Sequence, residues 1–285
     1  MDARIVGALS WGSTSAEAPS RSSTPMCPCN DDAQYRTSEN LSRRADLFKQ
    51  FGTGAWHAWV FDHLLAAGLP GEARVADIGG GPGWLWQQNA ARIPVGWLVT
   101  HTDLSSGMVA EARANIARPG SAFDVVDAQH LPFADASLDA VVANHMLYHV
   151  PDRARAISEF ARVLKPRGQL FAATNGEEHM AEIPVLIAAF NRLNGGIFPA
   201  WPKLGFTLES GKSELERYFT HVALHHAQRG VMRITEARPL VACIASLGWP
   251  DEATKTELLA YVEALIAAQR TVLIRTQSGI FVARK

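Results

Sequence analysis

The chain has 285 residues, 47% of them hydrophobic, and its 27 Lys and Arg nearly balance its 28 Asp and Glu. This composition predicts one large globular core with additions, and a net charge of −1 without a basic block argues against a nucleic-acid partner. No apolar run approaches the roughly 18 residues that span a bilayer, and residues 1–11 lack the pattern of a secretory signal, so we expect a cytoplasmic protein without membrane contact.

The first 37 residues differ in composition from the rest of the chain. Residues 1–37 are rich in Ser, Pro, Asp and Thr and have few periodic apolar positions, so we expect a disordered arm before a domain of residues 38–285. The arm holds Cys27 and Cys29, and the only other cysteine is the distant Cys243. A metal site would need further ligands that the local sequence does not offer, so we expect no bound metal.

Two amphipathic helices are predicted within residues 41–65, where apolar side chains recur at helical spacing. Trp56, Trp59 and Phe61 lie in the second helix and fit either an aromatic ligand box or the core. Aromatic residues at helical spacing are more often core, so we favour the core.

A glycine-rich stretch follows these helices. Residues 75–84 read Val-Ala-Asp-Ile-Gly-Gly-Gly-Pro-Gly-Trp, which predicts a buried strand that turns into a loop with a ligand lying against its backbone. The loop does not match the dinucleotide fingerprint, because Trp84 replaces the third glycine, and it lacks the Lys followed by Ser or Thr of a phosphate loop. The Asp77 carboxylate would repel a pyrophosphate and would suit a ligand that carries positive charge.

Asp77-x-Gly79-x-Gly81-x-Gly83 resembles the first motif of class I S-adenosylmethionine-dependent methyltransferases. The resemblance implies that S-adenosylmethionine is the cofactor and that this loop holds its amino-acid end. It also implies a role for Tyr35, because a segment before the first strand often folds over the cofactor in this family.

Asp103 lies twenty residues after Gly83, close to the spacing at which an acid meets the ribose hydroxyls in nucleotide-binding sheets. Asp103-Leu104-Ser105-Ser106-Gly107-Met108 resembles the second motif of the family, which implies that Leu104 borders the cofactor and that Met108 packs near the adenine. The alternative for Asp103 is a cap on the helix that follows.

The third and fourth strands are predicted at residues 122–126 and 138–143, because parallel strands buried on both faces read as continuous apolar runs. The resemblance implies that Asp127 and the Ala128 amide recognise the adenine edge, although an acid in a turn is the alternative for Asp127. Asn144 ends the fourth strand on the ligand side of the sheet, so it is a candidate for the methionine part of the cofactor.

Four polar residues are candidates for catalysis: His145 and His149 after the fourth strand, and Asn175 and His179 after a fifth strand at residues 169–174. Imidazole titrates in the range that suits proton transfer, although a histidine is more often structural. The helix before the fifth strand, residues 154–165, ends at Pro166-Arg167-Gly168. The family usually has glycine where Arg167 stands, and we expect Arg167 to be exposed.

Two stretches exceed what the minimal fold needs. Residues 177–220 and 234–270 are predicted as helical insertions that begin on the ligand side of the sheet and cover the pocket. Residues 195–202 are too rich in Gly and Pro for a helix and would shape this cover. With strands at 222–226 and 279–284, the resemblance implies an α/β, Rossmann-like, doubly wound sheet of seven strands with the last strand antiparallel.

The resemblance implies methyl transfer from S-adenosylmethionine to a small-molecule acceptor, with a role in secondary metabolism. Two alternatives stay open. A few enzymes similar to these methyltransferases cyclise S-adenosylmethionine itself to azetidine-2-carboxylate and release methylthioadenosine. In the second alternative, the domain binds the nucleoside but catalyses no reaction.

Overall fold

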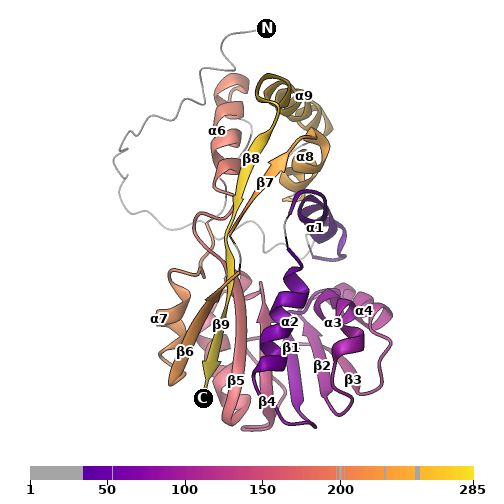
Figure 1. Ribbon diagram of the computed structural model, residues 1–285, viewed down its shortest axis with the longest axis vertical. Helices are drawn as coiled ribbons and strands as arrows, with labels where there is room; N and C mark the ends of the chain where they lie inside the picture. The colour runs from indigo at the N-terminus through magenta and orange to yellow at the C-terminus, as the bar shows by residue number, and fades with distance from the viewer. Residues whose placement is uncertain are drawn as a thin grey trace.

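The computed structural model describes residues 35–52, 54–196, 198, 201, 203–227, 229–247 and 251–285. The expectation of a disordered arm falls almost entirely outside these residues, as do Cys27, Cys29 and half of the Gly- and Pro-rich stretch 195–202. The described chain forms a large sheet with helices on both faces and, beyond one end of that sheet, a smaller group of helices around two strands (Figure 1).

The large sheet has seven strands in the order β3-β2-β1-β4-β5-β9-β6. β9 runs antiparallel to both of its neighbours, while the other paired strands are parallel, so the predicted fold is confirmed. The order reverses between β1 and β4, which is where ligands of such sheets bind. The strands are Arg74–Ile78 (β1), Leu98–Asp103 (β2), Ser121–Val125 (β3), Leu138–Asn144 (β4), Leu164–Asn175 (β5), His221–His226 (β6) and Ser278–Arg284 (β9).

Each face of this sheet carries its own hydrophobic core, because successive side chains of a strand point to opposite faces. One core joins alternate residues of the central strands to Phe61 and Trp86, and the other joins the intervening residues to Phe160 and Phe281. The covering helices are α2 (Trp56–Ala66), α3 (Trp84–Gln88), α4 (Ser106–Asn115), α5 (Arg153–Val163) and α7 (Gly211–Leu215), with short 3-10 turns η3 (Ala90–Arg92) and η4 (Leu147–His149).

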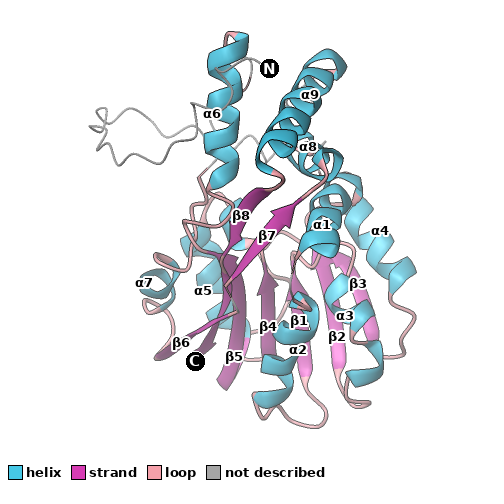
Figure 2. Ribbon diagram, turned by 45° about the horizontal axis from the view of Figure 1, so that its top comes forward, coloured by secondary structure: helices cyan, strands magenta, loops and turns pink. Residues whose placement is uncertain are grey.

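The smaller group, which we call the lid, has a hydrophobic core of its own. It contains an antiparallel pair of strands that the sequence did not predict, β7 (Gly230–Ile234) and β8 (Val272–Thr276). Figure 2 shows the lid helices around these strands, above the large sheet. The lid helices are α1 (Glu39–Phe51), α6 (Glu182–Asn194), α8 (Ala237–Ala245) and α9 (Glu252–Gln269).

The lid is assembled from distant parts of the chain. Leu47 of α1 is fully buried in the same core as Phe190 of α6 and Ile274 of β8. The first helix therefore belongs to the lid and not to the sheet. None of the described helices is long and apolar enough to cross a membrane.

Candidate functional site

A cavity of about 2000 Å³ lies between the carboxyl ends of the central strands and the lid. Its walls come from the glycine loop, the start of α4, the ends of β4 and β5, and the pocket-facing side of α1. Every residue predicted for the site lines this cavity except Gly83.

The glycine loop is shaped by left-handed backbone and close packing. Gly79 has φ 64°, and a Cβ at this position would lie 2.7 Å from the Cβ of Met146. Gly83 has φ 76° and precedes α3, where a Cβ would lie 2.5 Å from the Cδ1 of Ile116. The conformation and the packing against Ile116 therefore account for glycine at position 83 without a ligand.

Asp77 is held beneath the loop with almost no exposure to solvent. Its Oδ2 accepts a hydrogen bond of 2.8 Å from the indole Nε1 of Trp86 and lies 3.8 Å from Nδ1 of His101. Its Oδ1 is buried and has no hydrogen-bond partner among the described residues. Because a buried carboxylate oxygen without a partner is costly, this atom fits a role as acceptor for a ligand donor.

Asp103 ties the glycine loop to the start of α4. Its carboxylate accepts 2.9 Å hydrogen bonds from the backbone nitrogens of Gly81 and Ser105. Burial raises the pKa of Asp103, and these two hydrogen bonds oppose that rise. The N-cap of α4 is Ser105 and not Asp103, so Asp103 supports the helix start only through the backbone nitrogen of Ser105. Each carboxylate oxygen keeps a further lone pair for a ligand.

The residues predicted around the adenine lie along the same wall. Asp127 accepts hydrogen bonds of 2.9 and 3.0 Å from the backbone and side chain of Gln129. Burial raises the pKa of Asp127, but the hydrogen bonds from Gln129 and the neighbouring His130 together outweigh it and leave the pKa below its usual value. Met108 and Ala128 are buried next to the cavity, whereas Leu104 is largely exposed at its edge.

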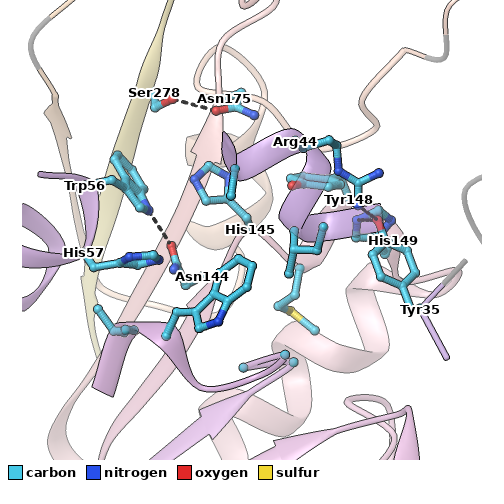
Figure 3. A pocket seen from close by; sticks show the side chains of 18 of the residues that line it. Tyr35, Arg44, Trp56, His57, Asn144, His145, Tyr148, His149, Asn175 and Ser278 are labelled. Atoms are coloured by element: carbon cyan, nitrogen blue, oxygen red, sulfur yellow. Dashed lines mark hydrogen bonds between the residues drawn. The ribbon is translucent and has the colours of Figure 1, made fainter. Parts of the chain in front are cut away.

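Asn144 and His145 lie together at the end of β4 (Figure 3). The indole Nε1 of Trp56 donates to Oδ1 of Asn144 at 3.3 Å, and the rings of Trp56 and His145 lie 4.9 Å apart. His145 has a strained φ of 57°, and its buried Nδ1 has no hydrogen-bond partner among the described residues. Burial lowers the pKa of His145 to about 3, so the ring is neutral at physiological pH.

His149 takes part in a network that joins the lid to the sheet. The Tyr35 hydroxyl lies 3.2 Å from Nε2 of His149 and accepts a 3.3 Å hydrogen bond from Arg44 of α1. The Tyr35 carbonyl accepts a 2.8 Å hydrogen bond from the Ser105 hydroxyl. Burial, together with the charge of Arg44, lowers the pKa of His149 to about 4.

Asn175 and His179 lie where the chain passes from the sheet into the lid. The Ser278 hydroxyl donates to Oδ1 of Asn175 at 2.6 Å, and the Gln277 backbone nitrogen donates to Nδ1 of His179 at 3.0 Å. The His179 ring stacks on Phe48 at 5.9 Å, and burial lowers the pKa of His179 to about 4. Both side chains line the cavity, and their hydrogen bonds join the end of β5 and the segment after it to the start of β9.

Several cavity residues were missed or misjudged from the sequence. Trp56 and Trp59 line the cavity besides packing on the core, so only Phe61 of the three aromatic residues has a purely core role. Arg44 and Tyr148 also line the cavity and were not singled out. For Tyr148 a signal was present, since an aromatic residue between His145 and His149 continues a polar, aromatic run after a buried strand.

Residues 76–172 match a family of methyltransferase domains. The chain is 38% identical over 137 residues to a demethylmenaquinone methyltransferase of Beutenbergia cavernae, a match that covers 47% of this chain and 55% of the relative. It is 35% identical over 153 residues to a malonyl-[acyl-carrier protein] O-methyltransferase of Erwinia pyrifoliae, with 52% of each covered. The chain thus spans about half the length of these curated relatives.

Solved structures share the fold at low identity. The YcgJ protein of Bacillus subtilis covers 80% of this chain and 98% of its own, with a TM-score of 0.55 and 18% identity. A putative methyltransferase of Bacillus halodurans gives a TM-score of 0.54 at 19% identity, covering 80% of this chain and 99% of its own. The match over residues 76–172 and the sheet order agree with the resemblance drawn from the motifs, so this part of the chain is similar to methyltransferase domains and the fold is the one that these solved structures share.

Proposed function

We propose that this protein transfers the methyl group of S-adenosylmethionine to a small-molecule acceptor, in secondary metabolism. The observation that carries the proposal is the cavity itself, with the cofactor motifs on one wall and the lid opposite. Its volume of about 2000 Å³ exceeds the roughly 300–1000 Å³ that one drug-sized ligand occupies, so it has room for a cofactor and a second molecule.

In this proposal the cofactor lies across the reversal point of the sheet. Asp77, Gly79 and Asn144 hold its amino-acid end, and the unpartnered Oδ1 of Asp77 accepts from the cofactor ammonium. Asp103 accepts from the ribose hydroxyls. Asp127, Ala128 and Met108 surround the adenine, while Tyr35 closes over the nucleoside from the lid side.

The acceptor brings its own nucleophile. His145, His149 and His179 have pKa values lowered to about 3, about 4 and about 4. Since an ordinary histidine titrates near about 6.5, these rings hold a proton roughly a thousandfold more weakly and are poor general bases at neutral pH. They and Asn175 instead orient the acceptor by hydrogen bonds. Methyl transfer is an in-line displacement that needs mainly alignment and exclusion of water.

A second candidate function uses the same site, and the neutral polar groups near the proposed amino-acid end favour it. Asn144, His145 and Asn175 line the cavity, and in this reaction they would orient an uncharged amine. That amine would attack the γ-carbon of the same molecule: the N–Cγ bond forms, the Cγ–S bond breaks, and the ammonium proton goes to water. The products are azetidine-2-carboxylate and methylthioadenosine.

One incubation separates the two reactions. Purified protein with S-adenosylmethionine alone is followed by mass spectrometry, and a protein-free sample corrects for spontaneous breakdown. Methyltransfer predicts no product until an acceptor is added, when S-adenosylhomocysteine is released. Enzyme-dependent methylthioadenosine together with azetidine-2-carboxylate would replace the first proposal with the second. Calorimetric binding of S-adenosylmethionine without any turnover across amine, phenol and carboxylic acid acceptors would support the non-catalytic alternative.

A further inference from the structure

A continuous series of aromatic rings crosses the cavity (Figure 3). Neighbouring ring centroids are 5.3, 4.9, 6.3, 4.5 and 5.2 Å apart. We call this series the aromatic wall; in spatial order its members are Trp59, Trp56, His145, Tyr148, His149 and Tyr35.

The aromatic wall carries no charge at neutral pH. Burial lowers the pKa of His145 to about 3 and that of His149 to about 4, so both imidazoles are neutral. Burial also raises the pKa of Tyr35 and of Tyr148, which keeps both phenols protonated. The faces of neutral aromatic rings are electron-rich and attract a cation that lies over them.

Trp56 contacts the residue that ends β4, beside the reversal point of the sheet. Its indole nitrogen donates to Asn144, which ends β4, and β4 pairs with β1, whose last residues lead into Gly79. In the proposed cofactor position, the sulfonium connects the amino-acid end at Gly79 and Asn144 to the ribose at Asp103. The sulfonium in this position therefore lies beside Trp56, not beside Tyr35.

We propose that Trp56 faces the sulfonium of bound S-adenosylmethionine and makes the site prefer the charged cofactor over its neutral, demethylated product. This inference rests on the proposed cofactor site and adds a specificity-determining residue to it. Loss of the methyl group removes the positive charge, so the attraction to the ring ends with the reaction. Trp56 thereby favours release of S-adenosylhomocysteine and its replacement by a new cofactor.

Two substitutions separate the ring from the hydrogen bond to Asn144. Trp56→Phe removes the indole nitrogen and keeps a ring, whereas Trp56→Leu removes both and keeps apolar bulk. Calorimetry with S-adenosylmethionine and with S-adenosylhomocysteine gives the ratio of the two affinities for each variant. We expect Trp56→Leu to lower that ratio about tenfold and Trp56→Phe to change it less than about threefold.

A matched control is available in the same cavity. Trp201 lines the lid side, and Trp201→Leu is expected to leave the ratio unchanged. Thermal unfolding and binding of S-adenosylhomocysteine report whether each variant is folded; if Trp56→Leu is not, Trp56→Met replaces it. Equal losses for both ligands in the ring-free variant would overturn this inference and leave the cofactor site standing. Failure of the unaltered protein to bind either ligand would overturn the proposed function itself.

Discussion

Asp103 joins two parts of the proposed cofactor site. Its two backbone hydrogen bonds fix the glycine loop at Gly81 and the start of α4 at Ser105. His149, in contrast, is bonded to Tyr35 in the lid network. At the scale of single residues, the two side chains are therefore expected to contribute unequally to cofactor binding.

We expect Asp103→Ala to weaken S-adenosylmethionine binding about ten- to a hundredfold, the range set by hydrogen bonds to a charged group. His149→Ala is the matched comparison and is expected to have a smaller effect. Both dissociation constants are measurable by calorimetry, with circular dichroism to confirm folding. An equal or reversed order would overturn the assignment of Asp103 to the ribose.

The buried histidines also predict how stability depends on pH. In the unfolded chain histidine titrates near about 6.5, whereas His149 has its pKa lowered to about 4 by burial and by Arg44. Below pH 6.5 the unfolded chain binds more protons than the folded one, so stability is full above this pH and falls as the pH drops toward 4.

At pH 5 this difference amounts to at most about 2 kcal/mol for His149. Urea unfolding of the unaltered protein at pH 7.5 and pH 5.0 measures the total loss, to which the other buried histidines add. His149→Gln removes one titrating group. The variant is therefore expected to lose less free energy of unfolding between the two pH values than the unaltered protein, by up to this amount. The same pH dependence in both proteins would contradict the prediction.

At the scale of elements, sequence patterns predicted the strands of the large sheet but not the two strands of the lid. The central strands β1, β4 and the second half of β5 are apolar runs buried on both faces, which is a strong local signal. β7 and β8 have five residues each and are only half-buried, and such short runs cannot be told from helix flanks by pattern alone. The place of α1 in the lid depends on Leu47 meeting residues more than a hundred positions away, which no local pattern encodes.

The same distinction applies to the site. Asp77, Asp103 and Asn144 lie within the last two residues of β1, β2 and β4, and Asp127 lies two residues after β3. Their common edge is therefore readable from the sequence. Arg44 and Trp56 reach the cavity through helix packing, and their partners Tyr35 and Asn144 become neighbours only in the folded chain.

The first turn of the chain within β5 contains a local conflict between sequence and conformation. Arg167 is exposed, as expected, and has φ 69°, the left-handed conformation that the family's usual glycine adopts without strain. A non-glycine residue there costs about 1–2 kcal/mol, and glycine returns about 0.4–1 kcal/mol through the entropy of the unfolded chain.

Arg167→Gly is therefore expected to raise the free energy of unfolding by about 0.5–1 kcal/mol. Chemical denaturation measures this change. Arg167→Lys keeps the left-handed strain and serves as the control, with no expected gain. A loss of stability in the glycine variant would show that the Arg167 side chain contributes contacts worth more than the strain it imposes.

At the scale of the whole molecule, the cavity lies between cores that belong to different parts of the protein. The sheet supplies one wall, and the lid holds α1, and with it Arg44 and Phe48, against that wall from a separate core. Cofactor binding should therefore be sensitive to packing in the lid core and insensitive to packing in the sheet core below the site.

A matched pair of substitutions tests this dependence. Leu47 and Leu64 are both fully buried, the first in the lid core and the second in a core of the large sheet. Each Leu→Ala change is expected to lower the free energy of unfolding by about 2–5 kcal/mol, the usual range for a buried leucine.

At a temperature where both variants remain folded, only Leu47→Ala is expected to weaken S-adenosylmethionine binding. The reason is that a loosened α1 reduces the fraction of molecules with a complete cavity, and the apparent dissociation constant rises by the inverse of that fraction. Equal affinities in the two variants, measured by calorimetry, would show that the sheet wall alone binds the cofactor and that the lid serves only the acceptor.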